Sequence, residues 1–187
     1  YLGQAITLGK SLAKANPDYK FVVGLVDRIE HRKDLLKEID FEIIEIEKVG
    51  VEDFEGMCKR YTIVELNTAV KPYFASFLMD KYKEYKNFSY MDPDMYVYQS
   101  LKPLEEALSS YNIVLTPHMT SSPTIEKNVS EYGVLKVGIF NLGFIGMSRS
   151  IETDRFLKWW QGKLLHECIY DRQKNINVDQ GWVTLAP

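Results

Sequence analysis

Apolar residues recur along the chain in two patterns, one typical of amphipathic helices and the other of buried strands. The near-helical pattern predicts helices over residues 2–15, 32–39, 101–111, 124–134 and 150–171, and two more within 51–82, the second kinked or started by Pro72. Short apolar and β-branched runs predict strands over residues 21–27, 88–92 and 112–118, a more exposed strand over 41–49, and a bent strand or strand pair over 139–149. Strands that alternate with helices indicate an α/β domain.

The apolar run at residues 21–26 bears on the type of sheet. Such a continuous run is typical of a strand covered on both faces, as in a parallel sheet between helices. We therefore predict a mainly parallel sheet, in a single domain over residues 1–187. The sequence starts without Met on a helical pattern, and we expect it to be a fragment with material missing at both ends.

Composition and charge narrow the class of protein. The chain is 45% hydrophobic and 26% charged, which is typical of a globular domain with a sizeable core. The formal charge of −3 argues against a nucleic-acid partner, which usually meets a basic surface. Apolar runs stay shorter than the roughly 20 residues that cross a bilayer. Cys58 and Cys168 fit no metal or redox spacing, and we expect reduced thiols and a cytoplasmic location.

Two carboxylates lie at the end of the predicted strand over residues 88–92. Asp92 and Asp94 are separated by Pro93, and in an extended segment alternate residues point to the same side. The two acids can then converge on one cation, and their hard oxygen atoms favour Mg²⁺ or Mn²⁺, which share their remaining sites with water and substrate phosphates. Because Asp and Pro are also common turn residues, a turn without a metal is the alternative.

Two further polar residues end predicted strands. In open α/β sheets, ligands bind beyond the carboxyl ends of the strands, where Asp27 and His118 also fall. Asp27 is either a binding residue or a cap for the segment that follows. His118 is either a contact for an acceptor or phosphate, or a structural histidine.

Four segments, in this order, resemble parts of glycosyltransferases with the GT-A fold. "YTIVELNTAVKPYFASFLM" resembles the helix whose basic residue approaches the nucleotide sugar, and "YMDPDMYV" the strand that ends in hydrophobic–Asp–x–Asp. "FNLGFIGMSRS" is similar to the Asn–x–Gly–Phe strand of the donor-sugar pocket, and "NVDQGWVTLAP" to the Asp–Gln helix start that follows it. The resemblance implies a three-layer α/β/α sandwich, here without its first strand and its C-terminal end.

The resemblance also implies roles for single residues. Asp92 and Asp94 would hold the metal that bridges the protein and the diphosphate, while Asp179 and Gln180 would be catalytic and lie near the anomeric carbon. His118 would contact the acceptor or a phosphate. The implied nucleotide-sugar contacts are Asp27, Lys71, Tyr90, Met91, Pro93, Asn141 and Gly143.

Each of these roles has a local chemical rationale and a structural alternative. Lys71 can place a positive charge near phosphates, or be a solvated helix residue. Asn141 can exchange hydrogen bonds with sugar hydroxyls and Gly143 permits a close approach, although a strand bulge is the alternative. Asp179 can act as the base for an acceptor hydroxyl or bind a sugar, or simply cap the helix that follows.

The expected function is metal-dependent transfer of a sugar from a nucleoside diphosphate, linked to uridine or guanosine, to a glycan, a lipid-linked acceptor or another hydroxyl. The Asn–x–Gly–Phe and Asp–Gln segments resemble most the retaining, glycogenin-like group, which favours retention. Peripheral membrane association through the missing regions stays open. The alternatives are a non-catalytic domain that binds nucleotide sugars or carbohydrates, and another Mg²⁺-dependent phosphoryl-transfer enzyme of the α/β class.

Overall fold

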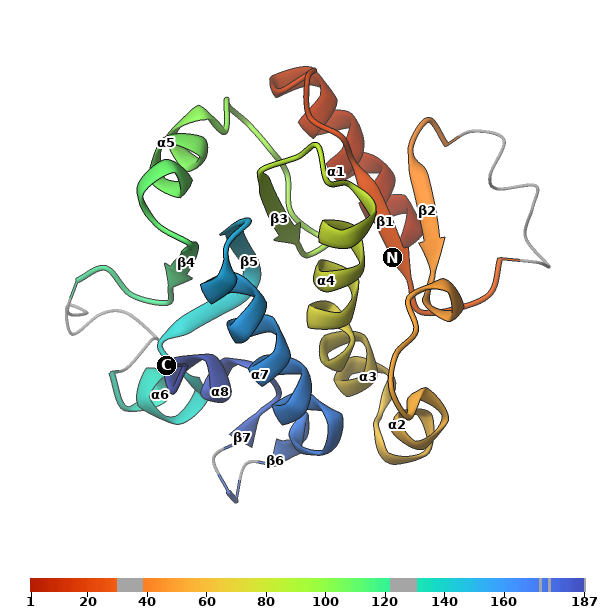
Figure 1. Cartoon of the computed structure of the whole chain (residues 1–187). Helices are drawn as coiled ribbons and strands as arrows, with labels where there is room; N and C mark the ends of the chain where they lie inside the picture. The colour runs from red at the N-terminus through yellow and green to blue at the C-terminus, as the bar shows by residue number, and fades with distance from the viewer. Residues whose placement is uncertain (30–38, 122–130, 172, 175, 187) are drawn as a thin grey trace.

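The computed structural model describes residues 1–29, 39–121, 131–171, 173–174 and 176–186 (Figure 1). Its helices are α1 (Leu2–Ala15), the short 3-10 helix η2 (Ile46–Lys48), α2 (Phe54–Arg60), α3 (Ile63–Ala69), α4 (Lys71–Lys81), α5 (Lys102–Ser110), α6 (Glu131–Val137), α7 (Ile151–Glu167) and α8 (Gln180–Thr184). Its strands are β1 (Val22–Leu25), β2 (Glu42–Glu45), β3 (Asn87–Met91), β4 (Ile113–Pro117), β5 (Phe140–Ser148), β6 (Tyr170–Asp171) and β7 (Ile176–Asn177). The predicted α/β class is confirmed.

The strands form three small sheets. β5 lies between β3 and β4 and runs antiparallel to both, β1 pairs with β2 in parallel, and β6 pairs with β7 as an antiparallel hairpin. The prediction of a mainly parallel sheet is therefore wrong for the described pairs, of which only β1–β2 is parallel. Strands covered on both faces are apolar throughout whichever way they run, so the sequence pattern did not give the direction of β5.

The predicted helices need several corrections. The segment 51–82 forms three helices instead of two, because the chain turns at Tyr61 and again at Val70. Pro72 lies in the first turn of α4, where its missing N–H costs nothing. α7 ends at Glu167 rather than at residue 171, and the predicted strand over 41–49 changes to η2 after Glu45. Most of the helix predicted over 32–39 and the first part of that over 124–134 lie outside the described residues.

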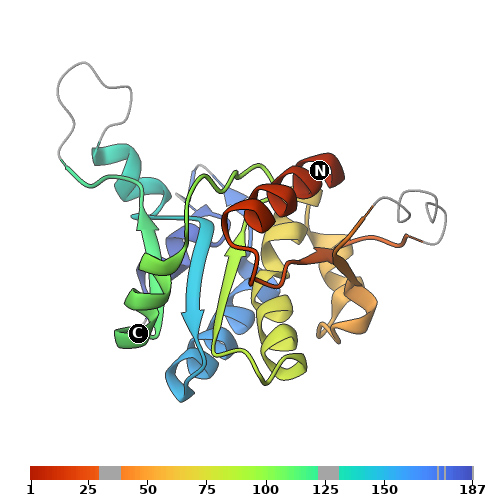
Figure 2. The same cartoon turned by 90° about the horizontal axis from the view of Figure 1, so that it is seen from above.

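The core lies where α4 and α7 pack against the β3–β5–β4 sheet (Figures 1 and 2). Ile145 and Met147 of β5 are buried there, as are Trp160 and Leu164 of α7. Burial of each such side chain stabilises the fold by roughly 1.5–3 kcal/mol. The sheet that carries β3 and β5 is therefore a firm support for residues at the ends of these strands.

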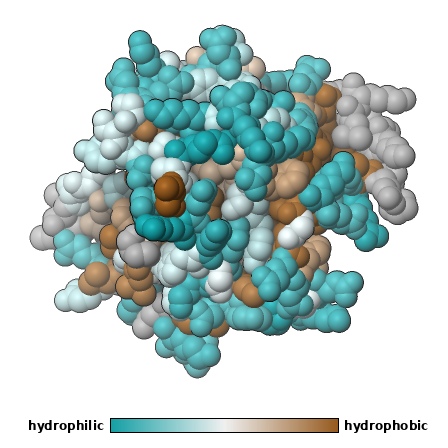
Figure 3. All heavy atoms as spheres, in the orientation of Figure 1, coloured by the Kyte–Doolittle hydropathy of each residue, from teal (hydrophilic) through white to brown (hydrophobic). Residues whose placement is uncertain are grey.

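β1 is the main exception to the predicted burial. Its apolar residues were expected to be covered on both faces, but Val22, Val23 and Leu25 are half-buried and Gly24 is exposed. Figure 3 shows hydrophobic side chains at the surface over this part of the molecule. Among the described helices, none combines the length and the apolar character that a membrane crossing requires.

Candidate functional site

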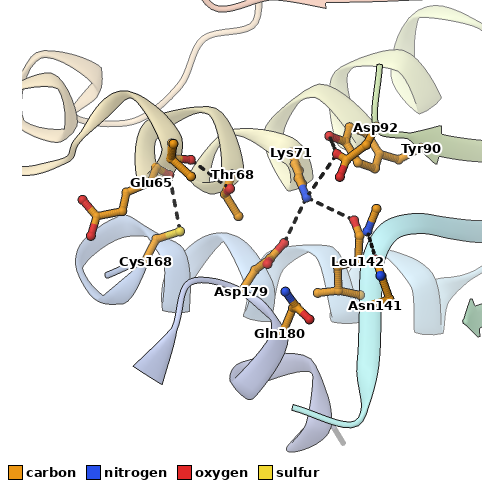
Figure 4. Close-up of polar contacts among 12 residues, drawn as sticks. Glu65, Thr68, Lys71, Tyr90, Asp92, Asn141, Leu142, Cys168, Asp179 and Gln180 are labelled. Atoms are coloured by element: carbon orange, nitrogen blue, oxygen red, sulfur yellow. Dashed lines mark hydrogen bonds and ion pairs between the residues drawn. The ribbon is translucent and has the colours of Figure 1, made fainter. Parts of the chain in front are cut away.

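Lys71 joins four separate parts of the chain (Figure 4). Its ammonium group donates a hydrogen bond to the backbone carbonyl of Leu142, over 3.1 Å. It also lies 3.4 Å from a carboxylate oxygen of Asp179 and 3.7 Å from one of Asp92. The Lys71 side chain is only 10% exposed. The alternative that Lys71 is a solvated helix residue is therefore wrong, and the lysine belongs to a buried polar cluster.

Local helix chemistry fixes the position of Lys71. Thr62 precedes α3 as the N-cap of a capping box, in which its hydroxyl accepts from the backbone N–H of Glu65 and the Glu65 carboxylate accepts from the backbone N–H of Thr62. α3 ends at Ala69, α4 begins at Lys71, and Val70 alone separates the two helices. Lys71 thus lies at the start of α4, where the break between the helices directs its side chain toward β5 and α8.

Glu65 also ties α3 to the segment that leads to Asp179. Its second carboxylate oxygen accepts a hydrogen bond from the backbone N–H of Tyr170, over 2.7 Å. The thiol of Cys168 donates to the backbone carbonyl of Glu65. The helix pair that carries Lys71 and the chain segment after α7 are therefore held together a short distance before Asp179.

Asp92 and Gly143 are neighbours at the ends of β3 and β5. The backbone N–H of Asp92 donates to the carbonyl of Gly143 over 2.7 Å, and the Tyr90 hydroxyl donates to the Asp92 carboxylate. A Cβ atom at Gly143 would lie 3.0 Å from an oxygen of Asp92 and 3.0 Å from the Asn141 amide oxygen, so both would have to move. The Asn141 oxygen in turn accepts from the backbone N–H of Gly143, over 2.9 Å.

A register shift in the β4–β5 ladder accounts for this geometry. Leu115 of β4 pairs with Ile145, but the next residue, Thr116, pairs with Asn141. The intervening residues 142–144 of β5 therefore have no partner in β4. Such bulges often occur beside functional sites, where they re-aim the chain. Here the carbonyl groups of Leu142 and Gly143 accept from Lys71 and Asp92.

Asp179 is buried, with 1% of its surface exposed. It precedes α8 but its side chain forms no cap hydrogen bond, so the alternative of a simple helix cap is wrong. Burial raises the pKa of Asp179, and the nearby Lys71 ammonium opposes that rise. One carboxylate oxygen has no hydrogen-bond partner among the described residues, and its polar neighbour is the Lys71 ammonium.

The side chains of His118 and Gln180 contact each other, next to Asp179 in the sequence. The His118 Nε2 atom lies 2.5 Å from the Gln180 side-chain oxygen, and the backbone N–H of His118 donates to Ile139. His118 thus has a structural partner in α8. It does not line the main cleft described next.

Lys71 and Asp92 also line a cleft of about 990 Å³. The predicted site residues that line it are Asp27, Lys71, Tyr90, Met91, Asp92, Pro93 and Asp94. Asn141, Gly143, His118, Asp179 and Gln180 do not line it. The structure therefore divides the predicted site into a cleft wall and an inner cluster, which meet at Lys71 and Asp92.

The two acids predicted to hold a metal differ in their surroundings. The Asp92 carboxylate is engaged by Tyr90 and Lys71, whereas the Asp94 carboxylate is exposed and has no hydrogen bond or ion pair to the residues that the structure describes. Among the residues that the structure describes, no three His, Cys, Asp or Glu side chains lie close enough together to hold a metal ion. Residues 92–95 form a turn, in which the Met95 N–H donates a hydrogen bond to the Asp92 carbonyl over 3.1 Å, so the extended conformation predicted for this segment is wrong. Carboxylates together with substrate phosphates are nonetheless the kind of donors that Mg²⁺ takes.

Sequence reasoning missed some groups of the site. Asn67 and Thr68 line the cleft one turn before Lys71, and the Leu142 carbonyl binds the Lys71 ammonium. Because the chain breaks between α3 and α4, helical spacing alone does not indicate that these two α3 residues share the cleft with Lys71. The Leu142 carbonyl is a backbone group, which every residue has, so the sequence cannot indicate that this one binds Lys71.

No protein-family model matches the chain. It is similar to a protein of Bacillus subtilis (strain 168) named "Uncharacterized protein YfnF", with 23% identity over 185 residues. The match covers 97% of this chain and 60% of the relative. The similarity therefore extends over almost all of the described elements.

Proposed function

We propose that the chain is part of a metal-dependent glycosyltransferase of the GT-A fold, with a three-layer α/β/α arrangement. It would transfer a sugar from a nucleoside-diphosphate sugar to the hydroxyl of a glycan or lipid-linked acceptor. The observation that supports this best is the junction at Lys71, where the end of β3, the bulge of β5 and the start of α8 meet around one ammonium group.

The cleft wall is suited to an anionic diphosphate. Asp92 and Asp94 would hold Mn²⁺ or Mg²⁺, which when bound would neutralise charge on the diphosphate as it leaves the sugar. Lys71 lines the same cleft and supplies a second positive charge near that position. The Tyr90 hydroxyl donates a hydrogen bond to the Asp92 carboxylate and would keep it oriented.

The inner cluster is suited to the sugar. Asn141 is exposed and offers its amide NH₂ to hydroxyl groups, while its oxygen is held by Gly143. Asp179 is buried beside Lys71, so a sugar hydroxyl would reach it only after the lysine moves toward the diphosphate. We therefore infer that donor binding separates Lys71 from Asp179 and so exposes the Asp179 carboxylate. The Gln180 side chain, held by His118, lies next to it. Retention of configuration remains the proposed stereochemistry.

Titration calorimetry with uridine and guanosine diphosphate sugars, with and without Mn²⁺, tests the proposal. We expect Mn²⁺-dependent binding by the chain, and loss of binding in Asp92→Asn and Asp94→Asn. Asp80→Asn is the matched control, since Asp80 is an exposed acid on α4 outside the cleft. Equal binding by all variants, or binding independent of the metal, would contradict the proposal.

Turnover is measured on these 187 residues with the same nucleotide sugars. Release of nucleoside diphosphate that disappears in Asp94→Ala supports transfer or hydrolysis. Tight binding without turnover would instead support a non-catalytic nucleotide-sugar-binding domain. That second candidate is favoured by one observation, the burial of Asp179 behind Lys71.

A further inference from the structure

An aromatic pair lies on the surface just after the two acids of the cleft wall. The rings of Tyr96 and Tyr98 contact each other, with centroids 4.6 Å apart and ring planes tilted by 46°. Tyr98 is 84% exposed and Tyr96 is 48% exposed, so packing into the core does not account for either ring. Exposed apolar side chains that gather in one place, rather than lie scattered, are typical of surfaces that bind a partner.

The backbone of residues 95–98 directs both tyrosines outward. Met95 and Val97 are half-buried while Tyr96 and Tyr98 are exposed, which is the alternation of an extended chain. The backbone N–H of Val97 donates a hydrogen bond to the hydroxyl of Ser11 on α1, over 3.0 Å, and Ser11 is buried. A buried polar group therefore fixes the inner side of this segment, and the two rings occupy its outer side.

A second buried residue fixes the end of the same segment. Asn16, which follows α1, accepts a hydrogen bond from the backbone N–H of Leu101 over 2.7 Å and donates one to the carbonyl of Gln99 over 3.3 Å. Residues 95–101 belong to no helix or strand, so these side chains replace the backbone ladder that would otherwise hold them. A loop that is already fixed loses little conformational entropy when a ligand binds, which favours binding.

The pair lies close to the expected site of sugar transfer. Asp94 precedes Tyr96 by two residues, and because consecutive Cα atoms are 3.8 Å apart, the Cα atoms of these two residues are at most about 8 Å apart. Asp94 lines the cleft, whereas Tyr96 and Tyr98 do not. A molecule that lies on the two rings can therefore extend one end to the cleft while the cleft holds another ligand.

The composition of the segment favours a neutral sugar chain as its partner. A pyranose ring has a face of C–H groups, which packs on an aromatic ring, and a rim of hydroxyl groups, which need hydrogen-bond partners. Residues 95–101 contain no charged side chain, whereas a surface that binds anionic membranes carries Lys and Arg. Gln99 and Ser100 are exposed beside the pair. The Gln99 side chain has no hydrogen bond to the residues that the structure describes, so its amide is available to hydroxyl groups.

We propose that Tyr96 and Tyr98 form an acceptor platform, on which a sugar ring of a neutral glycan stacks while the end of the glycan reaches the cleft. The inference rests on the glycosyltransferase function proposed above, and it names the acceptor as a glycan rather than the hydroxyl of a lipid. Gln99 would bind hydroxyl groups at the rim of the stacked ring. Because the rings lie outside the cleft, the platform binds the acceptor and leaves donor binding unchanged.

Saturation-transfer NMR with maltohexaose, cellohexaose and chitohexaose tests the platform. We expect at least one of these glycans to bind the 187-residue chain, with saturation passing from tyrosine ring protons to C–H protons of the sugar. The dissociation constant should rise by about tenfold in Tyr96→Ala and in Tyr98→Ala, because the stacking surface is lost, and should change little in Tyr98→Phe, which keeps the ring. Tyr111→Ala is the matched control, since Tyr111 is 66% exposed and follows α5.

Calorimetry with a nucleotide sugar and Mn²⁺ on the same variants separates this inference from the proposed function. Weaker glycan binding with unchanged donor affinity in Tyr96→Ala and Tyr98→Ala supports the platform. Donor binding without binding of any of the three glycans, or with equal glycan affinity in all variants, would overturn the platform and leave the proposed function intact. Glycan binding that depends on the two tyrosines, without any donor binding, would support the sugar-binding surface and contradict the transferase.

Vesicles of phosphatidylcholine and phosphatidylglycerol test a membrane as the other partner of the pair. We expect the chain to show no vesicle binding that depends on Tyr96 and Tyr98. Vesicle binding that is lost in Tyr96→Ala and Tyr98→Ala, with no binding of the three glycans, would show that the tyrosines meet a lipid surface and would overturn the proposal.

Discussion

The Lys71 ammonium lies 3.4 Å from a carboxylate oxygen of the buried Asp179, and this oxygen has no hydrogen-bond partner among the described residues. Lys71, in contrast, also contacts the Leu142 carbonyl and Asp92. Asp179 therefore depends on Lys71 more than Lys71 depends on Asp179. Removing the Lys71 ammonium should lower the free energy of unfolding more than removing the Asp179 carboxylate.

Lys71→Met should destabilise the fold by about 3–5 kcal/mol, because it leaves the Asp179 carboxylate buried without its ion pair. Asp179→Asn should cost much less, and the double variant should recover most of the loss of Lys71→Met. Urea unfolding of the three variants measures these differences. Equal costs for both single variants, with additive effects in the double variant, would argue against the coupling.

Gly143→Ala should disturb the site, since the new Cβ would lie 3.0 Å from Asp92 and from Asn141 oxygen atoms. We expect a loss of stability of about 1–3 kcal/mol and weaker nucleotide-sugar binding. Gly162→Ala is the matched control: a Cβ there meets no atom within 4 Å, and it lies inside α7. That change should stabilise the chain by about 0.5–1 kcal/mol and leave binding unchanged.

Tyr90→Phe should remove the hydroxyl that Asp92 accepts while keeping the aromatic ring in place. If Asp92 holds a metal, its affinity for Mn²⁺ with a nucleotide sugar should fall by about 10–100-fold, as is usual when a partner of a metal ligand is lost. Calorimetry compares the variant with Tyr111→Phe, since Tyr111 is 66% exposed. Unchanged affinity in Tyr90→Phe would mean that the hydroxyl does not orient Asp92 for binding.

Glu42 makes the stability of the fold depend on pH in the acid range. Lys81 and the Tyr82 hydroxyl lower the pKa of Glu42 from 4.5 to about 2. A carboxyl group with a lowered pKa in the folded state contributes stability above its unfolded pKa, and this contribution is lost as the pH falls toward the folded pKa. Glu42→Gln should therefore be less stable than the natural chain at pH 7, with the difference shrinking between pH 4.5 and about 2. Urea midpoints across this range measure it, and a constant difference would contradict the pairing.

The sequence predicted the location of most elements because apolar spacing is a local property. The strand at 87–91, the helix at 102–110 and the role of Pro72 as a helix start all follow from it. The direction of β5 and the half-burial of β1 depend on which strands become neighbours, and the spacing of apolar residues does not contain that information.

The candidate site was predicted in part for a similar reason. The acids after β3 and the glycine of β5 were found from their residue types, and the structure brings Asp92 and Gly143 into contact. The central position of Lys71 and the burial of Asp179 were not predicted from the residues alone. They follow from the break between α3 and α4 and from the tie between Glu65 and Tyr170, which join parts of the chain about 100 residues apart.

The register shift between Leu115 and Thr116 has a consequence for the identification of homologous sequences. Because side chains alternate between the two faces of a strand, one inserted or deleted residue between Asn141 and Ile145 would exchange inner and outer positions and separate Gly143 from Asp92. Length differences among true orthologues should therefore accumulate elsewhere, and an alignment that needs a gap within this short stretch most simply indicates a wrong match.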